Sequence, residues 1–342
     1  MDGEGICAGE YMVETKGITD DMSNNILILS CGTRDLLVRY FKRADYERVI
    51  GADCSELAPA LYEADKYYLI PRMKEEGYFD AILEICRKEG ITAILPLQED
   101  ELNLISENRE LFEKEGIRTI VSPVETLQIC RDKYCFFEHM TEHGIPVLNS
   151  YIDLDKFENA YEAGKIGFPV FVKPVRGAGS VGVMKVSSME LLKALFAYSE
   201  EPLLIQEFCN GREFGIDVYV DLVSGEVVDI FAKEKLRMRA GETEKSVTSN
   251  DPALKEFVYR AASTLKLSGP VDMDVFEKDG IFYLSEINPR FGGGFPHAYA
   301  CGVDTPSYIL QNLQGIANES HLQEKREEIY VLKYSDILCI DR

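Results

Sequence analysis

The sequence predicts an α/β domain followed by an α+β region. The chain has 342 residues, enough for two or three domains of ordinary size. In the first third, short apolar strands alternate with amphipathic helices, which is typical of a parallel sheet with crossover helices. From Phe168 onward, strands are separated by glycine-rich turns, which favours antiparallel pairing. We therefore expect a doubly wound parallel-sheet domain at the N-terminus and a distinct C-terminal part.

The N-terminal domain is predicted from four strands and the helices between them. Residues 26–30 are β-branched residues and leucines bounded by Asn24-Asn25 and Gly32, the pattern of a buried strand. The following segments repeat this alternation of strand and helix. The expected strands are 26–30, 48–52, 92–96 and 118–121, and the expected helices are 36–43, 78–89 and 102–115.

The C-terminal part opens with a helix over residues 131–143, which Gly144 and Pro146 should end. Short connections at Asn210-Gly211 and Ser224-Gly225 favour antiparallel hairpins. The polar segment 233–249 is interpreted as a loop, either solvated or able to close over a site and exclude water. The expected strands are 169–174, 181–186, 203–208, 214–222, 226–233, 271–277 and 281–286, with a helix over 254–265.

The charge balance excludes some classes of partner. The chain has 37 lysines and arginines against 59 aspartates and glutamates, a net charge of −22. Such a surface repels phosphate backbones and anionic lipid, so we expect no nucleic-acid and no membrane partner. Only a focused cluster of cations could bind a polyanion here.

The expected location is the cytoplasm. No apolar run approaches the ~20 residues of a membrane span, and the polar N-terminus lacks the pattern of a secretory signal. We expect residues 1–22 to be a disordered leader or an artificial extension, with Met22 as an alternative start. The nine cysteines include no Cys-x-x-Cys pair, which favours free thiols over a zinc site or disulfides.

A glycine-rich segment indicates a phosphate site. Gly177, Gly179 and Gly182 match G-x-G-x-x-G, but a strand rather than a helix is expected after them, unlike a dinucleotide fold. The alternatives are a flap whose N–H groups close over phosphates and a merely flexible hairpin. Lys173, at the end of the preceding strand, favours the flap because its ammonium can reach the same phosphates.

Two acidic strands indicate a metal site. Hairpin register about the turn at residues 278–280 places Asp272 or Asp274 opposite Glu286, with Asn288 on the face of Glu286. Carboxylate and amide oxygens suit Mg²⁺, although a solvated acidic hairpin is the simpler alternative. Arg290, before three glycines, could clamp a developing anion or a substrate carboxylate.

Taken in order, these motifs resemble the ATP-grasp superfamily, near the branch of carbamoyl-phosphate synthase large subunits and amino-acid ligases. The resemblance covers residues 26–313. It implies a pre-ATP-grasp domain and an ATP-grasp fold of two subdomains. The implied divisions are 23–122 for the N-terminal domain, 123–205 for the small subdomain with the flap, and 206–342 for the C-terminal subdomain with the metal and substrate site.

The resemblance also implies roles for individual residues. Mg²⁺ or Mn²⁺ would be bound by Asp274, Glu286 and Asn288, while Arg290 and Lys173 would lie beside the transferred phosphate. Glu213 would bind the ribose, and Arg237 and Arg239 are candidates for gripping a substrate carboxylate. The ATP-binding residues would be Lys133, Lys173, Gly177, Gly179, Ser180, Gly182, Gln206, Glu207, Phe208, Cys209 and Glu213, with Lys233 as a third cation for the triphosphate.

The implied activity is an ADP-forming carboxylate–amine ligase. ATP would activate a small carboxylate, an amino acid, as an acyl phosphate that an amine or ammonia attacks. The expected partners are these small molecules, and a homodimer is compatible. The alternatives are a non-catalytic ATP-binding regulatory module and a carbamoyl-phosphate-synthase-like enzyme that phosphorylates a carboxylate, although no ammonia-producing domain is recognisable. A nicotinamide-dependent oxidoreductase rests only on the glycine pattern. Substrate specificity is expected near Gly32-Thr33 and Gln98-Glu99.

Overall fold

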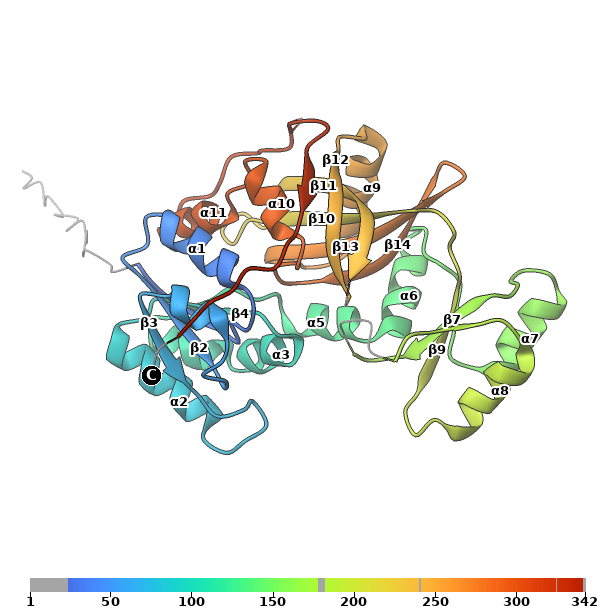
Figure 1. Ribbon diagram of the computed structural model, residues 1–342, viewed down its shortest axis with the longest axis horizontal. Coiled ribbons are helices and arrows are strands. Elements are labelled where there is room, and N and C mark those ends of the chain that lie inside the picture. The colour runs from blue at the N-terminus through green and yellow to red at the C-terminus, as the bar shows by residue number, and fades with distance from the viewer. Residues whose placement is uncertain (1–23, 178–181, 240, 324, 341–342) are drawn as a thin grey trace, which may run out of the picture.

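The computed structural model describes residues 24–177, 182–239, 241–323 and 325–340. The predicted leader over residues 1–22 lies outside them, as do Gly179 and Ser180 of the predicted flap. Three sheets organise the described chain, one parallel and two chiefly antiparallel (Figure 1). The mixed α/β class expected from the sequence is confirmed.

The N-terminal domain is a five-stranded parallel sheet in the order β3-β2-β1-β4-β5. Alternate residues of β1 face opposite sides, because Ile26 and Ile28 pack with α1 while Leu27 and Leu29 pack with α2 and α3. Helices therefore cover both faces, and the doubly wound arrangement is confirmed. Its elements are β1 (Asn25–Leu29), α1 (Asp35–Arg43), β2 (Arg48–Asp53), the 3-10 helix η1 (Pro59–Glu63), β3 (Lys66–Leu69), α2 (Tyr78–Glu89), β4 (Ala93–Pro96), α3 (Glu99–Glu107), α4 (Arg109–Lys114) and β5 (Arg118–Thr119).

A four-stranded antiparallel sheet in the order β6-β9-β7-β8 lies at the opposite end of the molecule (Figure 1). Phe157 of α7 and Leu192 of α8 pack with its strands in a separate core. The expected pairing across the glycine-rich segment is confirmed, since Val170 of β7 lies opposite Val186 of β8. The elements are β6 (Ser150–Tyr151), α7 (Leu154–Glu162), β7 (Val170–Pro174), β8 (Met184–Val186), α8 (Met189–Tyr198) and β9 (Leu203–Glu207).

A six-stranded antiparallel sheet in the order β14-β13-β10-β11-β12-β15 forms the largest layer. Helices α6 and α9 pack against it, with Phe136 and Met140 of α6 in its core. The remaining elements are α5 (Val124–Arg131), α6 (Lys133–Glu142), β10 (Arg212–Val220), β11 (Val227–Arg239), β12 (Glu242–Ser249), α9 (Pro252–Ala262), β13 (Gly269–Lys278), β14 (Ile281–Asn288), α10 (Phe295–Ala300), α11 (Thr305–Leu313) and β15 (Tyr330–Leu332).

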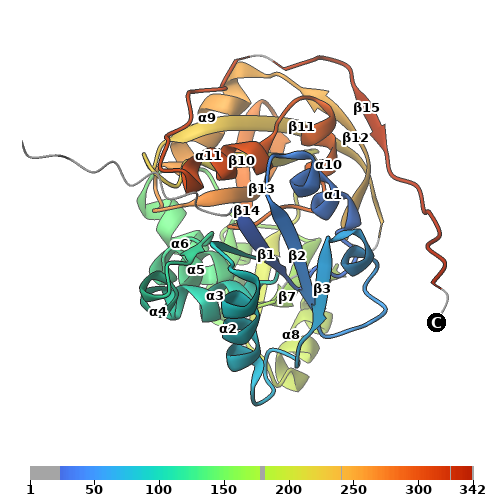
Figure 2. The ribbon, with the colours of Figure 1, turned by 90° about the vertical axis from the view of Figure 1, so that its left-hand side faces the viewer.

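The N-terminal domain is packed firmly against α10 and α11. The rings of Tyr40 and Tyr299 stack with centroids 3.7 Å apart, and Phe41 meets Phe291 edge-on at 6.0 Å. Tyr46 also donates a hydrogen bond of 3.0 Å to the carbonyl of Pro306. One apolar core therefore continues from the parallel sheet into the segment after β14. Figure 2 shows α1 lying beside α10.

The C-terminal segment contacts the six-stranded sheet through an ion pair and a short strand. Lys325 forms a buried ion pair of 3.0 Å with Asp229 on β11. Strand β15 then pairs with β12, and the chain continues alongside the N-terminal domain (Figures 1 and 2). Residues distant in the sequence thus meet where the two domains adjoin.

Several sequence predictions are wrong in detail. The segment 233–249 is not a loop, because β11 and β12 run through it as paired strands. The polar composition of this segment does not indicate a strand, yet Thr243 and Ser246 of β12 are buried. The Asn210-Gly211 connection is not a hairpin, since it leads from β9 into β10 of another sheet. Helices α5, α7 and α8 and strand β3 were not predicted, and the expected helix 102–115 is broken at Asn108.

None of the described helices is long and apolar enough to cross a membrane. The eight cysteines within the described residues are all free, as expected.

A buried carboxyl group lies at the carboxyl edge of the parallel sheet. Glu101 is fully buried and accepts hydrogen bonds from the hydroxyl of Ser30, at 2.9 Å, and from that of Tyr78. Its second oxygen, Oε2, has no partner among the described residues. Burial raises the pKa of Glu101 to about 7, because the charged form loses its hydration.

We expect this carboxyl group to make the fold less stable as the pH rises. The ordinary pKa is 4.5 and the folded pKa about 7, so the folded state binds more protons between these values. The free energy of unfolding should therefore fall through this window, by roughly 3 kcal/mol. Glu101→Gln keeps an acceptor for Ser30 and Tyr78 without the charge. Its stability relative to the parent should be greater at pH 8 than at pH 5, measured by urea unfolding. Glu107→Gln, an exposed change on the same helix, is the control, and an equal pH dependence in all three proteins would contradict the expectation.

Candidate functional site

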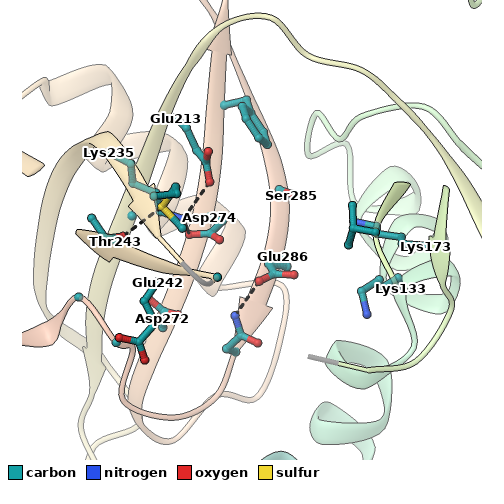
Figure 3. Close-up of a pocket in the computed structure, with 18 of the residues that line it drawn as sticks. Lys133, Lys173, Glu213, Lys235, Glu242, Thr243, Asp272, Asp274, Ser285 and Glu286 are labelled. Atoms are coloured by element: carbon teal, nitrogen blue, oxygen red, sulfur yellow. Dashed lines mark hydrogen bonds and ion pairs between the residues drawn. The ribbon is translucent and has the colours of Figure 1, made fainter. Parts of the chain in front are cut away.

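A cavity of about 510 Å³ lies between the four-stranded and six-stranded sheets. Its lining includes acidic residues from the six-stranded sheet and lysines from β7 and α6 on the other side (Figure 3). Both groups were identified in the sequence, and the structure brings them to one cavity.

The acidic side is set by the register of β13 and β14. Asp274 lies directly opposite Glu286, which confirms the register expected from the sequence, and Asp272 lies opposite Asn288. A bulge beyond Asp274 leaves Ser285 as an extra residue beside the cavity. The side-chain amide of Asn288 donates a hydrogen bond of 3.1 Å to Glu286. Asp272, Asp274, Glu286 and Asn288 therefore form one acidic group, to which the three carboxyl groups give a negative charge.

Lys235 partly neutralises this group and was not predicted. Its Nζ lies 2.5 Å from Asp274 Oδ1 and 2.9 Å from Glu213 Oε1 (Figure 3). Burial opposes its charge, but the two carboxylates raise the pKa of Lys235 above its ordinary value. The strand expected from the sequence ended at residue 233. If that strand had continued, alternation would have placed Lys235 on the same face as Lys233.

The pKa values of the two facing carboxyl groups move in opposite directions. Burial, with Asp272 and Glu286 nearby, raises the pKa of Asp274 despite Lys235. Lys173 and Asn288 outweigh burial and hold the pKa of Glu286 below its ordinary value. The two facing carboxyl groups therefore differ in how readily they lose a proton.

The two predicted phosphate lysines face the acids. Lys173 projects from β7 and donates a hydrogen bond of 2.9 Å to Gln206 Oε1. Lys133, the first residue of α6, donates one of 2.6 Å to the carbonyl of Gly177. Asp132 caps that helix by accepting from two backbone N–H groups, which fixes where Lys133 projects. Burial and the nearby Lys133 lower the pKa of Lys173.

The predicted adenine and ribose residues lie where β9 passes into β10. Gln206, Glu207, Cys209 and Glu213 all line the cavity. Phe208 does not, because its ring packs edge-on against Phe171 with Lys185 above it. Of the predicted flap residues, Gly177 lines the cavity, whereas Gly182 is not in its lining, and a β-carbon on Gly182 would lie 3.1 Å from Pro174 Cδ.

Lys233 is less free than expected for a phosphate-binding cation. It is almost completely buried and forms an ion pair with Asp217. A β-carbon on Gly294 would lie 2.4 Å from Lys233 Cε, so the glycine loop covers this lysine closely. Its ammonium is therefore already partnered within the floor of the cavity.

Arg290 occupies the end of the cavity nearest the N-terminal domain. It lies 3.7 Å from Asp272 and 3.9 Å from Glu99, at the outer limit of an ion pair. It also donates to the carbonyl of Phe291 at 3.0 Å. Since neither acid contacts it closely, the guanidinium retains unused donors.

Arg237 and Arg239 are not placed as expected. Both form ion pairs with Glu244, at 2.8 and 3.4 Å, and their side chains are more than half exposed. A register irregularity between Lys235 and Arg237 turns them away from the first cavity. Arg239 instead lines a second cavity of about 570 Å³, next to the first.

Arg34 lines both cavities and was not predicted, although the neighbouring Gly32-Thr33 was. Burial and the nearby Arg290 lower its pKa. The sequence did contain a signal for Arg34. It is a basic residue that directly follows Gly32-Thr33, a segment expected to reach the site.

The acidic group fits a divalent cation only in part. Its oxygens suit Mg²⁺, and several lie together without enough positive charge to balance them. Among the described residues, however, no three His, Cys, Asp or Glu side chains converge as a complete metal site. A cation here would need further oxygen ligands, such as the amide of Asn288 and phosphates.

Comparison with known proteins agrees with this arrangement. A model of the PylC-like N-terminal domain matches residues 26–120, and a model described as ATP-grasp in the biosynthetic pathway with Ter operon matches residues 199–337. The chain is therefore an ATP-grasp protein with a PylC-like N-terminal domain.

The curated relatives include carbamoyl phosphate synthases and D-alanine–D-alanine ligases. The arginine-specific carbamoyl phosphate synthase large chain of Bacillus subtilis is 28% identical over 194 residues, which are 53% of this chain and 18% of that protein. The D-alanine–D-alanine ligase of Ruminiclostridium cellulolyticum is 31% identical over 247 residues, 64% of this chain and 66% of that protein. The chain thus spans less than a fifth of the first relative.

Solved structures share the fold. The biotin carboxylase domain of Hydrogenobacter thermophilus 2-oxoglutarate carboxylase, in complex with MgADP, ADP and bicarbonate, has a TM-score of 0.72 at 21% identity. The matched region covers 90% of this chain and 73% of the carboxylase chain. The L-amino acid ligase of Bacillus licheniformis has a TM-score of 0.63 at 19% identity and covers 86% and 75%.

The glycine loop gives a structural prediction for the site. A β-carbon on Gly292 would lie 2.2 Å from Asp272 Oδ1, so Gly292→Ala must displace the carboxylate that faces Arg290. We expect the free energy of unfolding to fall by about 1–3 kcal/mol, as in other overpacked sites. Gly167→Ala is the control because its β-carbon would meet open space. Chemical denaturation measures both, and an unchanged stability for Gly292→Ala would show that the loop is less tightly packed.

Proposed function

We propose that this chain is an ADP-forming carboxylate–amine ligase that uses Mg·ATP. The observation that carries the proposal is the single cavity in which Lys133 and Lys173 face Asp274, Glu286 and Asn288. Cations for phosphates and oxygen ligands for a divalent cation are what phosphoryl transfer requires. The ligases among the relatives and the shared fold support it.

The roles proposed for the residues follow from their positions. Lys133 and Lys173 would bind the phosphates, since Lys133 contacts Gly177 at the start of the flap and Lys173 lines the same cavity. The end of β9 and Glu213 would hold the nucleoside. Arg290, with unused donors at the end of the cavity, would stabilise the phosphoryl group during transfer.

The residues that would hold Mg²⁺, or Mn²⁺, are Asp274, Glu286 and Asn288. When bound, the cation would neutralise phosphate charge and help to align the triphosphate. Lys235 would keep Asp274 and Glu213 in place by pairing with both, at 2.5 and 2.9 Å. Glu286 would remain ionised because Lys173 and Asn288 favour its charged form.

The proposed reaction has two steps. A substrate carboxylate oxygen attacks the γ-phosphorus, and the bond from that phosphorus to the β–γ bridging oxygen breaks, with its electron pair leaving on ADP. The amine nitrogen then attacks the acyl carbon, phosphate departs with the electrons of the C–O bond, and the nitrogen loses a proton. The protein's residues position these groups and exclude water from the acyl phosphate.

Turnover by purified full-length protein tests the proposal. ADP and phosphate release should depend on Mg·ATP, a carboxylate and an amine, assayed over panels of each. Arg290→Ala should lower kcat about 10²–10³-fold, the cost of removing one donor to a developing anion. Asp274→Asn should lower it as well, with a raised requirement for Mg²⁺. Tight binding of ATP with no turnover on any pair would favour a regulatory module instead.

Nucleotide binding is tested separately from turnover. Lys173→Ala should weaken binding of Mg·ADP by about 10–100-fold, because a charge-assisted hydrogen bond to phosphate is lost. Lys165→Ala, an exposed change in the same part of the chain, should bind as the parent does. Calorimetric titration measures both. Equal affinities for the two variants would contradict the assignment of Lys173.

A further inference from the structure

Arg34 lies where the two cavities join. It contributes to the lining of both, together with Glu242, Thr243 and Gly293. Its guanidinium forms no hydrogen bond or ion pair with any other described residue. Burial and the nearby positive charge of Arg290 lower the pKa of Arg34. Among the described residues, the closest carboxylate to either guanidinium is that of Asp272, 3.7 Å from Arg290, so both groups keep donors with which to bind an anion between them.

An acid lies beside this cation but does not neutralise it. A β-carbon on Gly293 would lie 3.5 Å from Arg34 Nη1 and 3.2 Å from Glu242 Oε1. Both groups therefore border the same point above Gly293, yet they are not within ion-pair distance of each other. The missing side chain keeps that point open. A ligand that carries both a negative and a positive charge fits between them.

The second cavity adds an apolar wall to these charges. Leu36 and Leu37 at the start of α1 line one part of it, and Phe295 and Pro296 of α10 line another. Leu36 is 38% exposed, so apolar surface is available to a ligand. Such a wall beside a paired cation and anion suits an α-amino acid with an apolar side chain.

The C-terminal segment forms one border of the cavity. Lys333 forms an ion pair of 2.8 Å with Glu242, and its backbone N–H donates to the carbonyl of Glu244 at 2.9 Å. These bonds place Tyr334 and Ser335 in the cavity lining. Tyr334 is 88% exposed, and a ring so poorly packed against the chain is free to pack against a ligand.

We propose that the second cavity binds an α-amino acid with an apolar side chain, with its carboxylate held by Arg34 beside Arg290, its ammonium near Glu242, and its side chain enclosed by Leu36, Phe295 and Tyr334. This rests on the proposed function, because the carboxylate end would face the cavity assigned to ATP. Arg34 would position the carboxylate, and Tyr334 would determine specificity.

Calorimetric titration of the full-length protein with Mg·ADP present tests the site directly. The probes are L-leucine, L-methionine and L-phenylalanine, with leucinamide and 4-methylpentanoate as analogues of leucine that lack its carboxylate or its ammonium group. We expect at least one of the three amino acids to bind. If leucine binds, each analogue should bind at least about 10-fold more weakly, because one charged contact is lost.

Variants assign the residues. Arg34→Ala should weaken binding of the amino acid about 10–100-fold and leave the affinity for Mg·ADP within about twofold. Arg34→Lys should recover part of the loss, and Arg87→Ala, an exposed arginine of the same domain, should have no effect. Tyr334→Ala should weaken binding of apolar amino acids but not of glycine. Tyr198→Ala matches its exposure of 88% and is the control.

The outcomes separate this site from the ligase proposal. Amino-acid binding that Arg34→Ala weakens, but with no ADP release on any amine, would support the site and contradict the ligase. ADP release with other carboxylates, but no binding of the three amino acids, would overturn the site and leave the ligase. Normal amino-acid binding by folded Arg34→Ala, with a circular dichroism spectrum like that of the parent, would also overturn it.

Discussion

The antiparallel pairing of β13 with β14 is the constraint on which the rest of the site depends. Because Asp274 lies opposite Glu286, two carboxylates must share one face of the sheet at close range. That arrangement is unfavourable unless cations approach them, and Lys235 from β11 and Lys173 from β7 provide the charge. The same register brings Arg290 to the boundary with the N-terminal domain, two residues after Asn288, the last paired residue of β14.

Sequence patterns were most informative where burial was complete or a turn fixed the register. The β1 strand and the hairpin of β13 and β14 follow directly from apolar periodicity and a Lys-Asp-Gly turn. The strands β11 and β12 were missed because charged and hydroxyl residues occupy them, and only tertiary pairing explains their extended form. Because β11 was not predicted to this length, Lys235 was not placed in the site either. Arg34 was missed although it directly follows Gly32-Thr33, because the residues around it come from distant parts of the chain.

Local charge and overall charge differ in this molecule. The chain carries a net charge of −22, yet Lys133, Lys173, Arg34 and Arg290 all line one cavity. Arg34 comes from the N-terminal domain and the other three come from separate segments after it, so folding concentrates the cations. The field inside a cavity depends on groups within a Debye length, which is about 10 Å at 0.1 M salt. An acidic exterior is therefore compatible with an anion-binding interior.

Lys133 and Lys173, the two lysines that face the acidic residues, belong to different packing units. Lys133 begins α6, whose apolar side shares a core with the six-stranded sheet, whereas Lys173 lies on the four-stranded sheet, which has a core of its own. The N–H of Lys133 donates to the carbonyl of Val175 at 3.1 Å, so the units also meet at this point. If the smaller unit turns about that contact, Lys173 travels with it while Lys133 and the acids stay fixed. The distance between Lys133 and Lys173 would then change with the width of the cavity.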